Sequence, residues 1–218
     1  MSDPNPLPTA RRIGYHPGMF TEDAEIMSRV AALETHWFNA LTAANQTAWR
    51  ARWTTRLPYD IKGRQYTANT PTSLNQVQVT EQRVYAWSQI WGDLRAGLPP
   101  VASPAASPSE PTITITSAAA VAPDLEIDFD SSPSGQSNLY LTCYASPPTY
   151  ADRRAPQWQL RHIQTFYGVA TPGEVNIGTR YNARFDFQPG RTVFCRLALI
   201  NANNELCSLS NILEAVMS

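Results

Sequence analysis

The hydrophobic period of the chain changes at a proline-rich segment, and this change constrains the fold more than any other feature. Before residue 98 apolar residues recur every three or four positions, and after residue 111 they alternate with polar ones. The first period is that of a helix with one buried face, and the second is that of a half-buried strand. The sequence therefore predicts an α+β protein of two domains. The segment between them, 98–111, is rich in Pro, Ala and Ser and is expected to be a semi-rigid linker.

Three helices are expected in the first half of the chain. The first starts at Thr21 as N-cap, the second is capped by Thr42, and the third opens at 71–73 and stops at Gly97. The segment 59–67 is expected to form a small hairpin or turn. Together they predict a compact helical module over 21–97. The apolar stripes are Ile26, Val30, Leu33, Trp37 and Leu41 in the first helix, Ala48, Trp49 and Trp53 in the second, and Val77, Val84, Trp87, Trp91 and Leu94 in the third.

Tryptophans are concentrated in this module, and they allow two interpretations. Five indoles lie in or beside the helical stripes. Because their spacing is that of core positions, and because indoles fill the space between short helices well, we favour a buried core. An exposed aromatic recognition surface is the alternative.

The second half carries the period of two expected for strands. Seven or so short strands in about a hundred residues predict an antiparallel β-sandwich over 112–218. The expected strands are 112–116, 124–130, 138–145, 158–166, 174–178, 181–187, 192–201 and 205–217.

Residues 1–20 are expected to form an extended N-terminal arm. Four prolines, at positions 4, 6, 8 and 17, each fix φ and remove an amide donor, which disfavours a helix or a central strand. Such an arm is either disordered or laid along another surface. Arg11, Arg12 and Tyr15 are its candidate partner-binding residues.

Composition excludes several classes of partner. The net charge is −1, so the chain lacks the basic patch that nucleic-acid binding requires. No stretch is long and apolar enough for a membrane span, and the N-terminus lacks the apolar region of a signal peptide. We therefore expect no nucleic-acid partner, no membrane association and synthesis in the cytoplasm.

Catalytic and metal-binding signatures are missing from the sequence. The three histidines, His16, His36 and His162, stand in no known nucleophile or zinc motif. The three cysteines form no C-x-x-C pair and are expected to be small buried hydrophobes. We therefore expect no enzyme activity, no cofactor, no metal and no small-molecule substrate.

Four acids alternate along the expected strand 124–130. Asp124, Glu126, Asp128 and Asp130 point to one face of that strand. Calcium needs six to eight oxygens that converge on one point, whereas a strand places its carboxylates in a row. A solvated strand face is the favoured interpretation.

The loop 147–158 is the first candidate for a contact made by the sandwich. It contains Tyr150, Arg153, Arg154 and Trp158, and these residue types are enriched at binding hot spots. An ordinary exposed loop is the alternative.

The final segment, RTVFCRLALINANNELCSLSN, resembles the last hairpin of a fibronectin type III or immunoglobulin-like domain. The resemblance covers 112–218 and implies a sandwich of that kind, although the Cys…Trp…Cys signature of true immunoglobulin domains is missing. With FNALTAANQTAW (38–49) and the linker, the whole layout is similar to bacterial and phage proteins that join a Trp-rich helical module to a fibronectin-like domain. That similarity implies a part of a virion or of a surface assembly.

These observations predict a non-enzymatic structural component of a large assembly, such as a capsid decoration or minor capsid protein of a phage. Its expected partners are other structural proteins of the same assembly, including copies of itself, and its expected location is the virion. The alternative is a β-sandwich binding module that recognises a carbohydrate or a protein at a cell surface.

Overall fold

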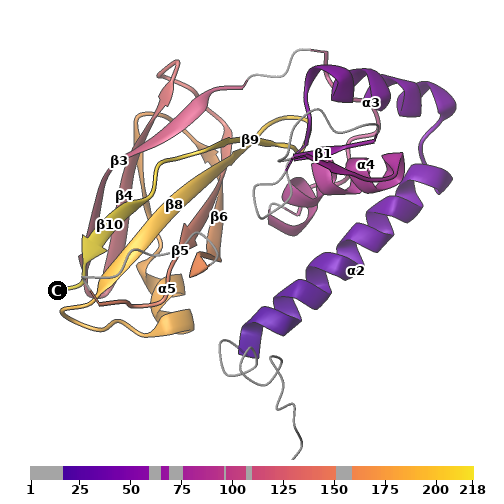
Figure 1. The fold of residues 1–218 in the computed structure, drawn as a ribbon. Coiled ribbons are helices and arrows are strands. Elements are labelled where there is room, and N and C mark those ends of the chain that lie inside the picture. Colours follow the sequence, from indigo (N-terminus) through magenta and orange to yellow (C-terminus); the bar gives the residue numbers. More distant parts are fainter. Residues whose placement is uncertain (1–16, 59–64, 69–75, 96, 107–109, 151–158) are drawn as a thin grey trace, which may run out of the picture.

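A computed structural model describes residues 17–58, 65–68, 76–95, 97–106, 110–150 and 159–218. Its helices lie mainly in the N-terminal half and its antiparallel sheets in the C-terminal half (Figure 1), so the α+β class is confirmed. None of the helices in the described part of the chain combines the length and apolar character that crossing a bilayer requires.

In its described residues the helical part has three helices and a two-stranded ribbon. The elements are α2 (Pro17–Asn39), α3 (Ala43–Thr55), β1 (Gln65–Thr67), β2 (Gln76–Gln78) and α4 (Glu81–Ile90), which runs directly into the π-helical turn η1 (Trp91–Arg95). The Thr42 side chain caps α3 by accepting the amide of Asn45 at 3.2 Å, as predicted. Gly97 follows η1 with φ +62°, and its amide donates to the backbone carbonyl of Asp93 at 3.1 Å, as expected of a glycine that ends a helix.

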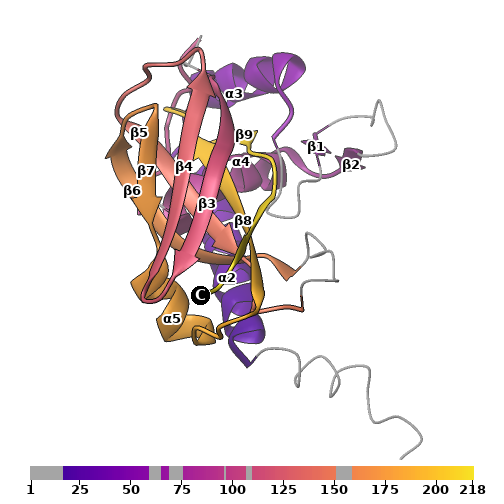
Figure 2. The same ribbon diagram turned by 90° about the vertical axis from the view of Figure 1, so that its left-hand side faces the viewer.

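Two sheets face each other in the C-terminal half. One has the order β3 (Thr112–Val121), β4 (Asp124–Ser132), β7 (Gly173–Asn176), and the other has the order β10 (Leu213–Val216), β8 (Thr192–Ile200), β5 (Leu139–Ala145), β6 (Arg161–Val169). β9 (Leu206–Leu209) pairs with β8. In Figure 2 the β3–β4–β7 sheet lies in front of the other sheet, and α5 (Gly178–Phe185) lies at one end.

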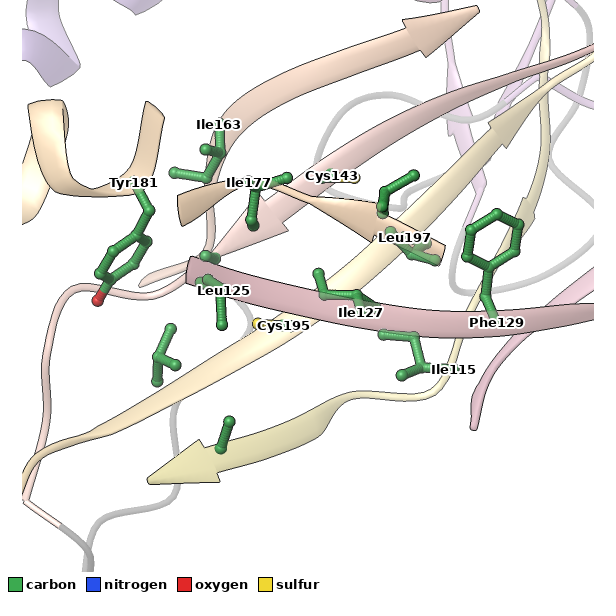
Figure 3. Close-up of a cluster of buried hydrophobic side chains, with 14 of the residues drawn as sticks. Ile115, Leu125, Ile127, Phe129, Cys143, Ile163, Ile177, Tyr181, Cys195 and Leu197 are labelled. Atoms are coloured by element: carbon green, nitrogen blue, oxygen red, sulfur yellow. The ribbon is translucent and has the colours of Figure 1, made fainter. Parts of the chain in front are cut away.

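The space between the sheets is filled mainly by aliphatic side chains and two cysteines. Figure 3 shows Leu125 and Phe129 of β4 close to Cys195 and Leu197 of β8. Cys143 and Cys195 are buried free thiols, as predicted for small hydrophobes. The acids of β4 lie on the opposite, outward face, so the alternation along this strand is confirmed.

The helical part packs on the outer face of the β8–β5 sheet and makes a third layer. As a result β8 is buried on both faces: Leu197 and Leu199 belong to the sandwich core, whereas Ala198 and Ile200 belong to the core beneath the helices. Trp91 meets Tyr144 of β5 edge to face, with ring centroids 6.5 Å apart. The five stripe tryptophans are all buried, which confirms the core interpretation.

One expected element is wrong in type. The segment 181–187 was expected as a strand, but most of it forms α5, because Tyr181 and Phe185 also stand at the i, i+4 spacing of a helix and their rings lie 5.4 Å apart. Of the expected hairpin or turn over 59–67, residues 59–64 lie outside the described residues, and 65–67 form β1, which pairs in parallel with β2.

Three expected boundaries also differ. α2 begins at Pro17, ahead of Thr21, because proline is tolerated in the first turn of a helix. The third helix begins at Glu81, and Val77 belongs to β2. The expected last strand is divided into β9 and β10 around Ser210, whose hydroxyl accepts the amide of Leu197 of β8 at 2.8 Å.

Candidate functional site

A polar groove of about 960 Å³ opens beside α3. It is lined by the C-terminal half of α3, by β1 and β2, by the start of α4, and by Glu110 and Cys207. This volume is at the upper end of the ~300–1,000 Å³ typical of ligand sites, but such sites are mostly apolar. Arg50, Gln65 and Gln76 line it together with Trp53 and Leu57, so polar and apolar side chains both contribute to its wall.

Charges along the groove are paired, so it favours neither anions nor cations. Arg50 forms an ion pair with Glu81 at 2.7 Å, and the hydrogen bond that its guanidinium donates to this carboxylate raises the pKa of Arg50. Glu110 accepts a hydrogen bond from Arg52 and forms an ion pair with Arg56.

A buried ion cluster lies next to the groove and joins α3 to the loop between β8 and β9. Glu205 of this loop is only 1% exposed. Its Oε2 lies 2.9 Å from Arg52 Nη2 and 3.7 Å from Arg56 Nε. Such a cluster adds little net stability, because its desolvation offsets its attraction, but removal of one partner is costly. We conclude that the cluster fixes where α3 sits on the sheet.

Asparagines of the same loop form a second buried junction, with α4 and the proline-rich segment. Gln89 of α4 donates to the carbonyl of Asn203 at 2.8 Å and accepts the amide of Val101 at 2.7 Å. Asn203 accepts the amide of Ala105, and Asn204 donates to the carbonyl of Pro99, each at 2.8 Å. The described residues of the expected linker are therefore held against both parts of the molecule.

Trp49 adds a further contact to the same segment. Its Nε1 donates to the carbonyls of Val101 and Ala102, each at 3.2 Å. The side chain is fully buried, so this indole is both a core residue of the helical part and an anchor for the proline-rich segment.

Cys207 is half-buried at the edge of the groove. Burial raises the pKa of its thiol, although the nearby Arg56 guanidinium acts in the opposite direction. Its Sγ donates to the carbonyl of Pro111 at 3.4 Å. The thiol is therefore protonated at neutral pH, which makes it a poor nucleophile.

Of the predicted partner-binding residues, only Tyr150 lies within the described residues. Its side chain is 59% exposed, and the Arg191 guanidinium lies over its ring, 3.5 Å from the centroid. This contact occupies one face of the ring. The remaining candidates lie outside the described residues: Arg11, Arg12, Tyr15, Arg153, Arg154 and Trp158.

The described histidines make structural contacts. His36 stacks on Tyr85 with ring centroids 6.1 Å apart, and His162 Nε2 lies 3.1 Å from Thr165 Oγ1. His16 lies outside the described residues. Within the described part of the chain, no group of His, Cys, Asp and Glu side chains has the arrangement to hold a metal ion.

Several large apolar side chains are exposed on both parts of the molecule. Phe38 of α2 is 64% exposed, and Val216 of β10 is 62% exposed. Others are Met27, Val121, Tyr150 and Tyr167. Exposed apolar side chains that gather on one face indicate contacts with a partner, whereas single ones need no explanation.

Comparison of the sequence with protein families and with curated proteins finds no match. The interpretation of the site therefore rests on its geometry.

Neither the groove nor the buried junction was predicted from the sequence. The loop 201–205 resembles an ordinary polar turn, and nothing local indicates that Asn203, Asn204 and Glu205 are buried. One signal was present: Arg52 and Arg56 stand one turn apart in a tryptophan-rich helix, as two cations on a largely buried face would.

Proposed function

We propose that this chain is a non-enzymatic structural component of a larger assembly. One observation carries the proposal: the helical part and the sandwich are joined as a single body by buried polar contacts around Glu205, Asn203 and Asn204. A structural subunit needs such rigidity, because contacts to its neighbours at several points require fixed relative positions. Exposed apolar side chains on both parts offer such contact points.

A phage virion is the assembly we propose, with this chain as a capsid decoration or minor capsid protein. The support is the resemblance of the layout to phage proteins and the proline-bearing N-terminal arm, which would lace onto neighbouring subunits. The sandwich is proposed to be of the fibronectin type III or immunoglobulin-like kind, on the resemblance of its last hairpin.

The experiment is a measurement of molecular mass by light scattering over a range of concentrations, for the full chain and for a full-length variant with Arg11→Ala, Arg12→Ala and Tyr15→Ala. We expect concentration-dependent self-association that the triple variant reduces. A monomer at all concentrations that also fails to bind purified particles would overturn the proposal.

A second candidate function is a binding module of a cell-surface protein, and the polar groove favours it. Its volume is within the range of ligand sites, and its lining combines polar groups with the aromatic ring of Trp53, as a site for a carbohydrate or an extended peptide would. Because Trp53 also lines the groove, a bound ligand should change the tryptophan fluorescence. A glycan or peptide array with the full chain, repeated with Gln65→Ala, would separate the two functions.

A further inference from the structure

Two arginines of α3 and an asparagine of the loop between β8 and β9 converge on one point at the end of the groove. Arg52 Nη2 lies 2.5 Å from Oε1 of Glu110, and Asn201 Nδ2 lies 3.4 Å from the same oxygen. Arg56 forms an ion pair with this oxygen as well. Donors that meet in this way at one carboxylate oxygen make an oxyanion site, and Glu110 is its occupant in this structure.

The donors of this site are buried, whereas its occupant is exposed. The Arg52 side chain is 10% exposed, and Asn201 is buried. The Glu110 side chain is 38% exposed, and it lines the groove together with Arg56. The donors therefore belong to the fixed body of the protein, and the occupant lies on the side from which a ligand would arrive.

Glu110 also leaves part of this site unsatisfied. Nε of Arg52 is buried and has no acceptor among the described residues, and the same holds for Nε1 of Trp53, which lines the groove. Buried donors in proteins nearly always have a partner. A carboxylate that is free to orient itself can accept from Nε and Nη2 of one arginine with its two oxygens, and this paired geometry makes such contacts strong.

The charges around the site favour a monoanion. Among the described residues, loss of Glu110 would leave Arg52 and Arg56 facing the single negative charge of Glu205, whose Oε2 lies 2.9 Å from Arg52 Nη2. One carboxylate restores the balance that Glu110 provides. A phosphate dianion would add a second negative charge beside the buried Glu205, where little water screens the repulsion.

We infer that the end of the groove is a binding site for a carboxylate of a partner peptide, and that Glu110 occupies this site until the peptide displaces it. The inference rests on the second proposed function, the binding module, for which it names the ligand. Because Glu110 belongs to the same chain, it competes at an effective concentration of about a millimolar or more. A peptide overcomes this competition through further contacts in the groove, whose volume of about 960 Å³ far exceeds that of one carboxylate.

Chemical rescue tests the site, with full-length Glu110→Ala and Glu110→Gln as a matched pair. Both variants lose the charge, but alanine leaves the site empty and glutamine keeps it filled. We expect acetate to stabilise Glu110→Ala against urea in a saturable way, with the folding equilibrium constant rising about 5-fold or more once acetate is in several-fold excess over its dissociation constant. Glu110→Gln and the wild type should show only the general effect of the salt, and neutral acetamide should not distinguish the variants.

The possible results of the rescue separate a site from general screening. An equal response of Glu110→Ala and Glu110→Gln would mean screening of charge, and a Glu110→Ala variant that responds to acetate no more than the wild type does would mean no site. Each of these results overturns the inference. If Glu110→Ala is unfolded without acetate, recovery of the folded tryptophan emission on its addition gives the same reading.

A peptide array tests the partner. We expect full-length Glu110→Ala to bind acidic peptides at least about 10-fold more tightly than the wild type does, because the internal competitor is gone. Replacing the glutamate of a peptide by glutamine, or amidating its C-terminus, shows whether the carboxylate comes from a side chain or from a chain end. If peptides bind without preference for a carboxylate, the binding module stands and the carboxylate site is wrong. If acetate rescues Glu110→Ala but no peptide binds, the partner is not a peptide and the inference is overturned.

Discussion

The two apolar cores of this protein differ in what they need from the rest of the chain. The sandwich core is built from residues between Ile113 and Met217, so one continuous half of the chain supplies all of it. The core beneath the helices is aromatic, and it includes Ala198, Ile200 and Leu206 from β8 and the start of β9. The sandwich has a complete interior of its own, whereas the helical part completes its interior on the back of a sheet.

This difference indicates which of the two parts depends on the other for its stability. A helical unit with few turns has little apolar area to bury, and short helices gain most of their stability from tertiary packing. The chain meets this need with a strand that is buried on both faces and with a polar loop that locks the helices onto it. We therefore expect the helical part to depend on the sandwich more than the sandwich depends on it.

Substitution of a tryptophan tests the dependence with the largest effect. We expect Trp49→Ala to lower the free energy of unfolding of the helical part by about 4 kcal/mol, because a fully buried indole is replaced by a cavity. Hydrogen exchange should show loss of amide protection in α3 and α4, with protection retained in β3 and β4. Leu197→Ala, at a fully buried position between the sheets, should remove protection in both parts. A single transition that unfolds both parts in Trp49→Ala would contradict the order of dependence.

Substitution of the buried carboxylate tests the junction itself. Glu205→Gln keeps the shape of the side chain but leaves Arg52 and Arg56 with Glu110 as their counter-charge among the described residues. We expect a loss of about 3 kcal/mol in urea unfolding, because removal of one partner from a buried ion pair leaves uncompensated charge.

Glu174→Gln, on an exposed site of β7, is the matched control and should change stability by less than about 0.5 kcal/mol. A similar small change for Glu205→Gln would mean that packing alone holds the two parts together.

Periodicity predicted the secondary structure of segments whose pattern alone determines it. It failed where the structure of a segment depends on contacts with residues far away in the sequence. Along β4, Leu125, Ile127 and Phe129 alternate with acids, and this pattern alone identifies a strand with one buried face. In α5 the spacing of the aromatic residues fits both the period of a strand and that of a helix. The close approach of Gly178 to the carbonyl of Pro123 leaves no room for a side chain, and it is a contact of the tertiary structure. The period from which a strand was predicted over 181–187 carries no information about that contact.

The junction was missed for the same reason. Asn203 and Glu205 are typical turn residues, and they are buried by helices that lie 114 and 153 positions earlier in the chain. Polar residues carry no hydrophobic period, so a sequence pattern does not separate a buried polar loop from an exposed one.

A glycine in the helical part offers a test of intermediate size. A Cβ on Gly92 would lie 2.2 Å from Cγ of Asn204, so the helix can approach the loop only because this residue has no side chain. We expect Gly92→Ala to destabilise the protein by about 2 kcal/mol through overpacking. Asn204 has φ +59°, a conformation that suits glycine, so Asn204→Gly relaxes the backbone but loses the hydrogen bond to the carbonyl of Pro99.

The double variant measures whether the two parts are coupled at this point. In Gly92→Ala with Asn204→Gly the clash is absent, and we expect it to be more stable than the sum of the two single effects by about 1–2 kcal/mol. If the two single stability changes add strictly in thermal unfolding, the helix and the loop move apart in Gly92→Ala and so avoid the clash.

The smallest expected effect concerns the self-contained core and its dependence on pH. Burial raises the pKa of Cys195 to about 12, from an ordinary value of 9.0. The folded protein therefore keeps this proton where the unfolded chain has lost it, and stability that is complete below pH 9 is lost as the pH rises toward 12. The contribution is ~1.4 kcal/mol per pH unit above pH 9. Urea unfolding at pH 8 and pH 10 should show a steeper loss in the wild type than in Cys195→Ala. Equal losses of stability in the two proteins would mean that water reaches the sandwich interior. The contrast between a sandwich core that is complete in itself and a helical core that needs residues of the sheet would then lose its physical basis.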